Sequence, residues 1–431
     1  GEFVPTTYTI PGTYSIEIKH GYVLRFTAKS NEGYAIASIV ASENKPPDTQ
    51  EVMDTSLIYE RPVEYRNVVG PFSVEITFRR ELWTDHPSDS LSGSGTKDDP
   101  YLITNGHDLG LIANEVNLNG NTYAGKYFKV YPLDEEGNLI SGIDLSQYYF
   151  NPIGVAGDAN KQFKGIISGE FKSFDNIKID GVSSRLGFFI EPSATITNLT
   201  FNNISVLSST AGAYVGGVAA RNLGTLTNIQ VNGVVEGAGY TGGVVGVNDG
   251  TITKVKSSVQ VTGYGTYTGG IAGINNETIQ IANNSGVVSG GTNSEYVGGI
   301  AGFTNLNSLI LEAGNYGSVS GKTAGGIVGN FARGTLTNVY NVAQVNGSSF
   351  AGGLFGYKNT ELETEANVSF AYNSGRVTGG STGGIYGYMA EGLDNNFNNV
   401  YYLNTYSGNT AQVGADSKTL SELQNINTFS L

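Results

Sequence analysis

The side chains that could carry catalysis are scarce and unevenly placed in this 431-residue chain. Hydrolysis or elimination at a polysaccharide needs paired carboxylates, or a carboxylate beside Arg or Lys, held close together. Between positions 187 and 390 the only aspartate is Asp249, in an Asn-Asp-Gly turn, and all three histidines lie before position 108. The sequence therefore predicts no catalytic, cofactor-binding or histidine-based metal site in this region.

Four tyrosines that recur one repeat apart are the candidates for ligand binding: Tyr214, Tyr240, Tyr267 and Tyr296. Tyrosine joins an apolar ring to a hydroxyl group, which suits an aromatic platform for sugar rings. The alternative is a buried ladder. Period-2 alternation, counted through the glycine pair that follows each tyrosine, places the tyrosines on the same side as the inward Val or Ile. Alternation therefore favours the buried ladder, and the platform is the functional hypothesis.

A cluster of three glutamates forms the one candidate cation site. Glu361, Glu363 and Glu365 would share one face of an extended segment. Three carboxylates can coordinate a calcium ion. A solvated acidic loop is the simpler interpretation, so calcium binding here is a hypothesis only.

A glycine pair that returns seven times, at intervals of 26 to 31 residues, organises the region around these candidates. The pairs begin at Gly216, Gly242, Gly269, Gly298, Gly325, Gly352 and Gly383. A period of this length indicates a solenoid, in which one coil buries its apolar side by stacking on the next. Each copy holds short alternating runs between Gly/Asn turns, which predicts a coil of β-strands. We expect the glycines to supply corners with positive φ and close backbone approach.

Proline and asparagine support the same architecture. Stacked parallel strands need every backbone N–H for the ladder between coils, and all eleven prolines lie at or before Pro192. Four asparagines are predicted to be turn and ladder residues, because asparagine tolerates the left-handed backbone conformation: Asn283, Asn315, Asn341 and Asn373.

The repeated string GG(V/I/L)xG, with GTLTNV at 334–339 and NSGxVxG at 284–290 and 373–379, resembles the GLUG-motif repeat of bacterial surface proteins. Adhesins of Bacteroidetes are among them. The segments 93–103 and 151–154 resemble the usual lead-in to such a domain. The resemblance covers about 93–431. It implies a right-handed parallel β-helix displayed on a cell surface, and it implies no catalytic residues.

The chain is predicted to be all-β, with a small antiparallel β domain at 1–85, a linker at 86–94 and the parallel β-helix at 95–431. A β-helix has two open ends that need covering. Apolar residues spaced by 3 and 4 at Asn105–Asn117 predict a capping helix over the first coil. The Thr-x-x-Glu spacing at Thr419–Leu423 predicts a short helix over the last coil.

Charge and composition limit the partners. The formal net charge of −14 argues against nucleic acid or an anionic membrane. The chain has no cysteine and no apolar run long enough to span a bilayer. We expect that any signal or lipid-anchor segment of a lipoprotein was removed before Gly1.

These observations predict a non-enzymatic adhesion protein on the extracellular face of the outer membrane. We expect a monomer that binds host glycans or an extracellular matrix protein. Two alternatives stay open. A carboxylate pair within about 10 Å on an exposed coil face would favour a carbohydrate-active enzyme, either a polysaccharide lyase or a hydrolase. A buried tyrosine ladder and an exterior without a distinct binding surface would favour a passive stalk.

Overall fold

The computed structural model describes residues 24–30, 33–42, 60–65, 73–291, 294–358, 366–390, 396–406, 408–410, 412 and 414–425. Glu361, Glu363 and Glu365 lie outside the described residues, so the calcium hypothesis remains a prediction. The chain forms two compact units, 1–81 and 82–431. The segment 86–94, predicted as a linker, falls within the second unit.

The first unit contains antiparallel strands, as the alternation in its sequence predicts. Strand β1 (Leu24–Lys29) pairs with β3 (Glu60–Tyr65), and β2 (Tyr34–Ser42) pairs with β4 (Ser73–Arg80). Ala35 and Ile36 of β2 are buried. The expected small antiparallel β domain at the N-terminal side is confirmed.

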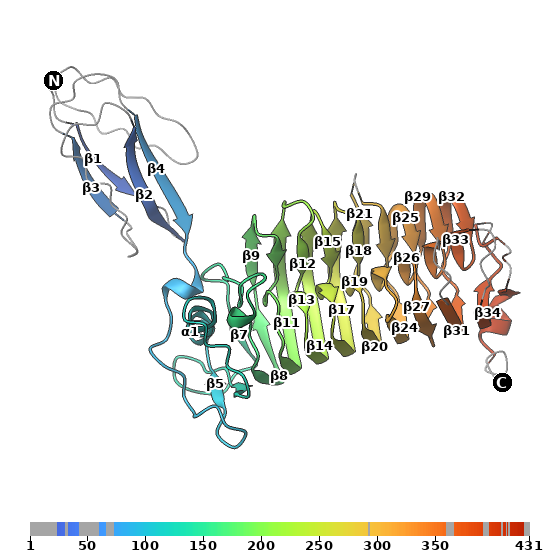
Figure 1. Ribbon diagram of the computed structural model, residues 1–431, viewed down its shortest axis with the longest axis horizontal. Coiled ribbons are helices and arrows are strands. Elements are labelled where there is room, and N and C mark those ends of the chain that lie inside the picture. The colour runs from blue at the N-terminus through green and yellow to red at the C-terminus, as the bar shows by residue number, and fades with distance from the viewer. Residues whose placement is uncertain are drawn as a thin grey trace. The chain divides into compact units, whose positions relative to one another are not determined.

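The second unit is a parallel β-solenoid of about 11 turns, which confirms the fold class (Figure 1). Its strands form one sheet of 24 strands and one of seven. The first turns contain β5 (Tyr101–Ile103), β6 (Tyr127–Val130), β7 (Gly142–Asp144), β8 (Ile166–Asp175), β9 (Lys178–Gly181) and β10 (Arg185–Leu186). Two short 3₁₀ helices, η1 (Trp83–Asp85) and η2 (Ala159–Lys161), lie in the connecting segments.

In the repeats, three groups of strands stack in parallel register. The short strands before the glycine corners are β12 (Tyr214–Gly216), β15 (Tyr240–Gly242), β18 (Tyr267–Gly269) and β22 (Tyr296–Gly298). The seven-stranded sheet after the corners consists of β13 (Ala219–Asn222), β16 (Val245–Asn248), β19 (Ala272–Asn275), β23 (Ala301–Thr304), β26 (Val328–Phe331), β30 (Phe355–Lys358) and β33 (Tyr386–Met389). The remaining strands are β11 (Thr195–Ser208), β14 (Thr225–Gly237), β17 (Thr251–Gly263), β20 (Thr278–Asn284), β21 (Val288–Gly290), β24 (Leu309–Asn315), β25 (Val319–Gly325), β27 (Gly334–Thr337), β28 (Tyr340–Asn341), β29 (Val345–Gly352), β31 (Ala366–Asn373), β32 (Val377–Gly383) and β34 (Asn396–Leu403).

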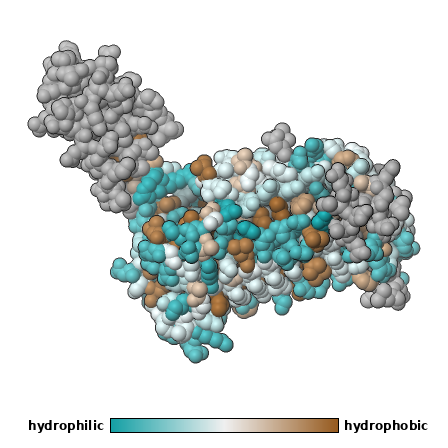
Figure 2. All heavy atoms as spheres, viewed as in Figure 1, coloured by the Kyte–Doolittle hydropathy of each residue, from teal (hydrophilic) through white to brown (hydrophobic). Residues whose placement is uncertain are grey.

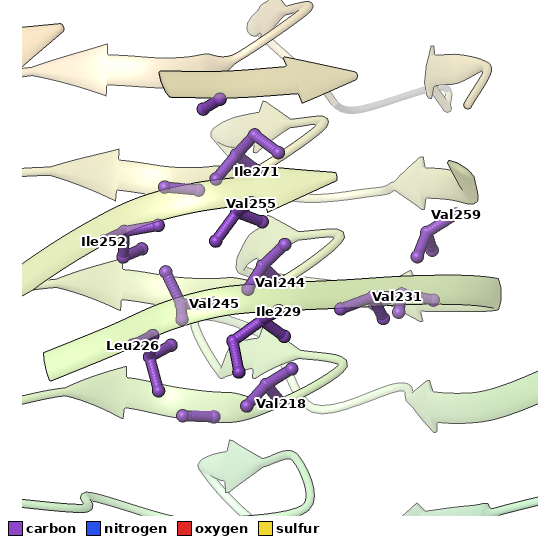
Figure 3. Close-up of a cluster of buried hydrophobic side chains, with 14 of the residues drawn as sticks. Val218, Leu226, Ile229, Val231, Val244, Val245, Ile252, Val255, Val259 and Ile271 are labelled. Atoms are coloured by element: carbon purple, nitrogen blue, oxygen red, sulfur yellow. The ribbon is translucent and has the colours of Figure 1, made fainter. Parts of the chain in front are cut away.

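The core runs along the stack because each apolar position repeats one coil later. Val218, Val244 and Ile271, two residues after the first glycine of successive pairs, are fully buried and lie above one another (Figure 3). Leu226 and Ile252 are paired in the facing strands and are also fully buried. One coil therefore cannot bury its apolar side alone, as the repeat length predicts.

In four of the seven pairs the second glycine makes room for a buried asparagine on the facing strand; these glycines are Gly270, Gly299, Gly326 and Gly353. Asn284, Asn315, Asn341 and Asn373 are fully buried and form a ladder. In it each Nδ2 donates to the Oδ1 one coil further on, at 2.9, 2.8 and 2.8 Å. A Cβ atom on Gly299 would lie 2.3 Å from Cγ of Asn315, and one on Gly326 would lie 2.4 Å from Cγ of Asn341. The glycine pair and the ladder asparagine thus depend on each other.

Two sequence predictions about these residues were wrong in detail. The ladder contains Asn284, whereas Asn283 lies beside it in the strand, opposite Gly314. None of the glycines of the seven pairs has positive φ, and neither do the ladder asparagines. Close backbone approach, not left-handed conformation, is what the glycine pairs require.

The left-handed conformation instead occurs once per coil at a separate corner, with φ between 52° and 55° in the repeats. Its occupants are Asn198, Asn228, Lys254, Ile281, Glu312, Asn338, Phe370 and Asn399. Asparagine tolerates this conformation, whereas a β-branched residue is strained in it. Ile281 is therefore at the least suitable of these positions, and its side chain is 36% exposed.

Replacing Ile281 by asparagine should stabilise the protein by about 1 kcal/mol, because it relieves left-handed strain and gives up little buried surface. Guanidinium denaturation of the purified variant would measure this gain. Val287→Asn is a matched control, since Val287 is 45% exposed and has no positive φ. A loss of stability in Ile281→Asn equal to that in the control would contradict the strain argument.

The first coil is covered by helix α1 (Gly106–Asn117), as predicted (Figure 1). Oδ1 of Asn105 caps its N-terminus by accepting from the Asp108 amide at 3.2 Å. Leu109, Ile112 and Val116 are buried on its inner face. The spacing of 3 and 4 in the sequence identified this face correctly.

The last coil is covered differently from the prediction. The capping box at Thr419 and Glu422 does form helix α2 (Leu420–Leu423), which follows β35 (Asp416–Lys418), but none of its residues is buried. Side-chain amides instead take the place of a further coil. Gln412 Oε1 accepts from the amides of Ile385 and Tyr386 at 2.7 and 2.8 Å. Asn409 Oδ1 accepts from the amide of Val377 at 3.1 Å.

We expect Gln412→Ala to open this end of the stack. It would leave the Ile385 and Tyr386 amides without their acceptor, at a cost of about 2–3 kcal/mol to the last coil. Hydrogen exchange should speed up at these two amides, and the exposed strand edge should promote self-association in sedimentation experiments. The exposed Gln260 provides the control substitution, Gln260→Ala. Unchanged exchange at both amides would refute this capping role.

Candidate functional site

The four predicted tyrosines do form a ladder along one flank of the solenoid. Parallel pairing aligns Tyr214 with Tyr240, Tyr240 with Tyr267, and Tyr267 with Tyr296. Successive ring centroids are 5.3, 5.6 and 5.7 Å apart, with interplanar angles of 27–32°. Each ring therefore faces its neighbours along the stack.

The ladder is not inside the core, which corrects the expectation that alternation placed it there. All four tyrosines are partly exposed, and the residue after each one is fully buried. The period-2 count fails because the chain bends at the glycine pair, and the Val or Ile beyond it lies in the bend between two strands. Whether these tyrosines bind a ligand remains a prediction.

A second column of aromatic side chains, which sequence reasoning missed, lies against the ladder. It comes from strands of the seven-stranded sheet, where Phe303, Asn330, Tyr357 and Tyr388 are aligned in register. Ring centroids of Phe303 and Tyr267 are 4.8 Å apart, and those of Tyr357 and Tyr296 are 5.7 Å apart. The signal was present in the sequence as an aromatic residue four or five positions after the glycine pair.

The two columns together define a surface that we call the aromatic flank. Its members are Tyr214, Tyr240, Tyr267, Tyr296, Phe303, Phe350, Tyr357 and Tyr388. Phe350 lies in the ladder column two coils beyond Tyr296, after Thr323. On the face of the solenoid that Figure 2 shows, hydrophobic residues recur at intervals among hydrophilic ones. The exterior of the repeats is therefore not uniformly polar.

A charged cluster closes the N-terminal end of the flank. The Arg185 guanidinium lies 5.0 Å from the ring centroid of Tyr214, and its Nη1 is 2.5 Å from Oε1 of Glu191. Arg221 binds Glu191 at 3.8 Å and also donates to Asp249 in the next coil. Asp249 is thus a turn residue with an ion-pair partner, and Glu191, only 3% exposed, is held by two arginines.

The hydroxyl groups of two tyrosines of the flank, Tyr267 and Tyr296, stay protonated at physiological pH. Burial raises the pKa of Tyr267 and of Tyr296, and neighbouring tyrosines raise both further. Since the ordinary value is already near 10, these hydroxyls act as neutral donors and acceptors. Because the rings face each other, they offer edges and hydroxyls outward more than open ring faces.

A carboxylate pair that the sequence analysis overlooked lies in the first coils, outside the repeats. Asp144 of β7 and Asp175 of β8 are aligned in parallel register. Asp144 accepts hydrogen bonds from Asn176 Nδ2 at 2.9 Å and from the Ser146 amide at 3.0 Å. Burial by itself would raise the pKa of Asp144, but these hydrogen bonds lower it overall. A lowered pKa does not suit the general acid of glycoside hydrolysis but does suit its base or nucleophile, so this pair keeps the enzymatic alternative open.

Two features of the described residues bear on other functions. No cluster of three or more His, Asp or Glu side chains there has the arrangement of a metal site. No helix in the same residues has the length and apolar character needed to cross a membrane.

Comparisons with known proteins give limited similarity. No family model matches the chain, so the likeness to the GLUG repeat remains a resemblance. A stretch of 149 residues, 34% of this chain, is 30% identical to halomucin of Haloquadratum walsbyi and spans 2% of that protein. Among solved structures, a "putative immunoglobulin A1 protease" from Bacteroides ovatus is 19% identical, with a TM-score of 0.42 over 78% of this chain and 88% of that one. These similarities assign no activity to the chain.

Proposed function

We propose that this chain is a non-enzymatic binding protein of a microbial cell surface, and that its aromatic flank contacts glycans. The observation that carries the proposal is the aromatic flank, in which partly exposed tyrosines repeat once per coil over four coils. The surface location follows from the resemblance to bacterial surface repeats, and the local match to halomucin is in keeping with it.

The geometry of the flank favours an extended polymer as ligand. Parallel strands lie about 4.8 Å apart, so a chain of sugars along the stack would meet the same hydroxyl and ring edge at each coil. Single contacts of this kind are weak, with Kd values on the order of millimolar. Many coils and many displayed copies would add them through effective concentration.

The two alternatives predict different behaviour. A carbohydrate-active enzyme would release new reducing ends or unsaturated sugars from polysaccharides, and Asp144 with Asp175 would be the carboxylates to substitute. A passive stalk would bind nothing along its flank. The aromatic flank favours a binding surface over a stalk, because a stalk has no need of partly exposed rings in register.

A screen of the purified chain against glycans and matrix proteins, combined with time-resolved product analysis, tests the proposal. We expect saturable binding of an extended glycan and no product. The double variant Tyr240→Ser, Tyr267→Ser should weaken binding at least tenfold. Tyr264→Ser is the matched control, because Tyr264 is 43% exposed in the same coil and lies outside the ladder.

The outcomes separate the three functions. Product formation at enzymatic rates would replace the binding proposal by an enzymatic one. Failure of every glycan and matrix protein to bind would leave the passive stalk as the remaining function. Equal binding by the ladder variant and the Tyr264 control would show that the aromatic flank is not the binding surface.

A further inference from the structure

A groove of about 480 Å³ lies on the outer face of the first coils, and its residues precede those of the aromatic flank in the sequence. Its floor is formed by neighbouring positions of β5, β6 and β8, where Leu102, Lys129 and Ser168 are aligned in register. Tyr127 and Tyr131 line it together with the side chains of Asp98 and Glu170. A volume of this size suits a ligand of one or two sugar rings.

One wall of the groove is built from strained backbone. Between Ser168 and Lys172, three residues of β8 face the single residue Asn198 of the next coil. Two of the three, Glu170 and Phe171, have φ values of 49° and 60°. Non-glycine residues in the left-handed region cost about 1–3 kcal/mol each. The facing corner of the next coil has one such residue, Asn198, whereas this corner has two in succession. Phe171, next to the groove residue Glu170, leaves 76% of its surface exposed.

The opposite wall is a loop held in place before any ligand arrives. Within it, the amides of Ser94 and Thr96 both donate to the Asp99 carbonyl at 3.1 Å. The Tyr127 amide of β6 donates to the Gly95 carbonyl at 3.1 Å, which ties the loop to the floor. A preformed groove loses less conformational entropy on binding than a mobile one.

The chemistry of the groove suits a saccharide ring. The tyrosine rings and Leu102 offer apolar contact, while carboxylates and a lysine on the walls accept and donate hydrogen bonds. Ser168 Oγ donates to Glu170 Oε1 at 2.7 Å, which orients that carboxylate. The Lys129 ammonium lies 5.7 Å from the ring centroid of Tyr131.

We propose that this groove is a second binding site, separate from the aromatic flank, and that it holds a pyranose residue of a glycan. The Tyr127 and Tyr131 rings contact the apolar part of the sugar, and Asp98 and Glu170 accept from its hydroxyl groups. The left-handed turn at Glu170 and Phe171 places the Glu170 carboxylate at the groove.

The test is titration of the full chain with methyl glycosides of glucose, galactose, N-acetylglucosamine and glucuronic acid, followed by NMR and calorimetry. We expect at least one to bind saturably, and Tyr127→Ala and Glu170→Gln each to weaken it at least tenfold. Glu170→Gly should raise the denaturation midpoint, because it relieves the left-handed strain, and should weaken binding to the same extent. A purely structural turn would not give gain of stability together with loss of affinity.

Tyr264→Ala serves as the control for tyrosine removal, and the ladder variant Tyr240→Ser, Tyr267→Ser tests independence from the flank. Both should bind the glycosides as the unaltered chain does. Saturable binding of none of the four glycosides would overturn the groove proposal and leave the flank proposal standing. Unchanged affinity in Tyr127→Ala and Glu170→Gln would overturn it as well, since the glycoside would then bind elsewhere.

Discussion

Gly326→Ala is expected to destabilise the solenoid by about 3–5 kcal/mol, a large effect for one added methyl group. A Cβ atom at this position would lie 2.1 Å from the carbonyl oxygen of Gly353 in the next coil and 2.4 Å from Cγ of Asn341. Neither neighbour is a flexible side-chain end that moves at little cost. Gly299 has the same surroundings, with Gly326 O at 2.1 Å and Asn315 Cγ at 2.3 Å, so Gly299→Ala should behave alike. Valine at either position should destabilise the solenoid more than alanine does.

Chemical denaturation followed by circular dichroism would measure this effect. Gly181→Ala is the matched control, because Gly181 ends β9, has no positive φ, and its added Cβ would meet only Leu186 Cδ1 at an ordinary 3.8 Å. Hydrogen exchange should show that the coils on either side of Gly326 open together, since stability in a stack is shared between neighbours. Equal stabilities of Gly326→Ala and Gly181→Ala would refute the requirement for close approach.

Asn341→Ala should cost about 3–4 kcal/mol, although the residue carries no charge. Its Nδ2 donates to Asn373 Oδ1 at 2.8 Å and to the Ala343 carbonyl at 2.9 Å. Its Oδ1 accepts from Asn315 Nδ2 at 2.8 Å. Removing the amide takes one hydrogen bond from each of these buried groups, although Asn315 Nδ2 still donates to the Gly317 carbonyl and Asn373 Oδ1 still accepts from the Gly375 amide. The lost bonds and the cavity left by the side chain together give the expected cost.

Asn346→Ala is the control, because Asn346 is exposed on the next strand. A double-mutant cycle with Gly326→Ala adds a sharper test. Loss of the Asn341 amide removes one of the two clashes, so the two substitutions together should cost less than their sum. Additive costs would show that the glycine pair and the asparagine ladder are independent, contrary to the structure.

The aromatic flank illustrates where local sequence patterns stop being reliable. Spacing alone identified the ladder of Tyr214, Tyr240, Tyr267 and Tyr296, because residues one repeat apart in a solenoid become neighbours. It did not determine which side of the strand they occupy. Alternation is valid only within one extended strand, and the bend at the glycine pair interrupts it.

The groove on the first coils was beyond sequence reasoning for a different reason. Its residues come from 97–102, 127–131 and 166–170, and no repeat relates these segments to one another. The bulge contains Gly169, but the residues with positive φ are Glu170 and Phe171, which are neither glycine nor asparagine. The pairing of Asp144 with Asp175 was likewise invisible until the register of β7 and β8 was known.

The sequence by itself determined the architecture: a period of 26 to 31 residues, glycine pairs and proline-free strands leave a stacked β coil as the arrangement that buries the apolar positions. It also determined the helix that covers the first coil, because a spacing of 3 and 4 is a local property. Only the tertiary structure decided that glycines of the pairs make room for buried asparagines on a facing strand, and that side-chain amides cover the last coil. It also decided which side chains meet at the flank and the groove. These contacts join residues from different strands and coils, and their geometry depends on register and bends that no local pattern encodes.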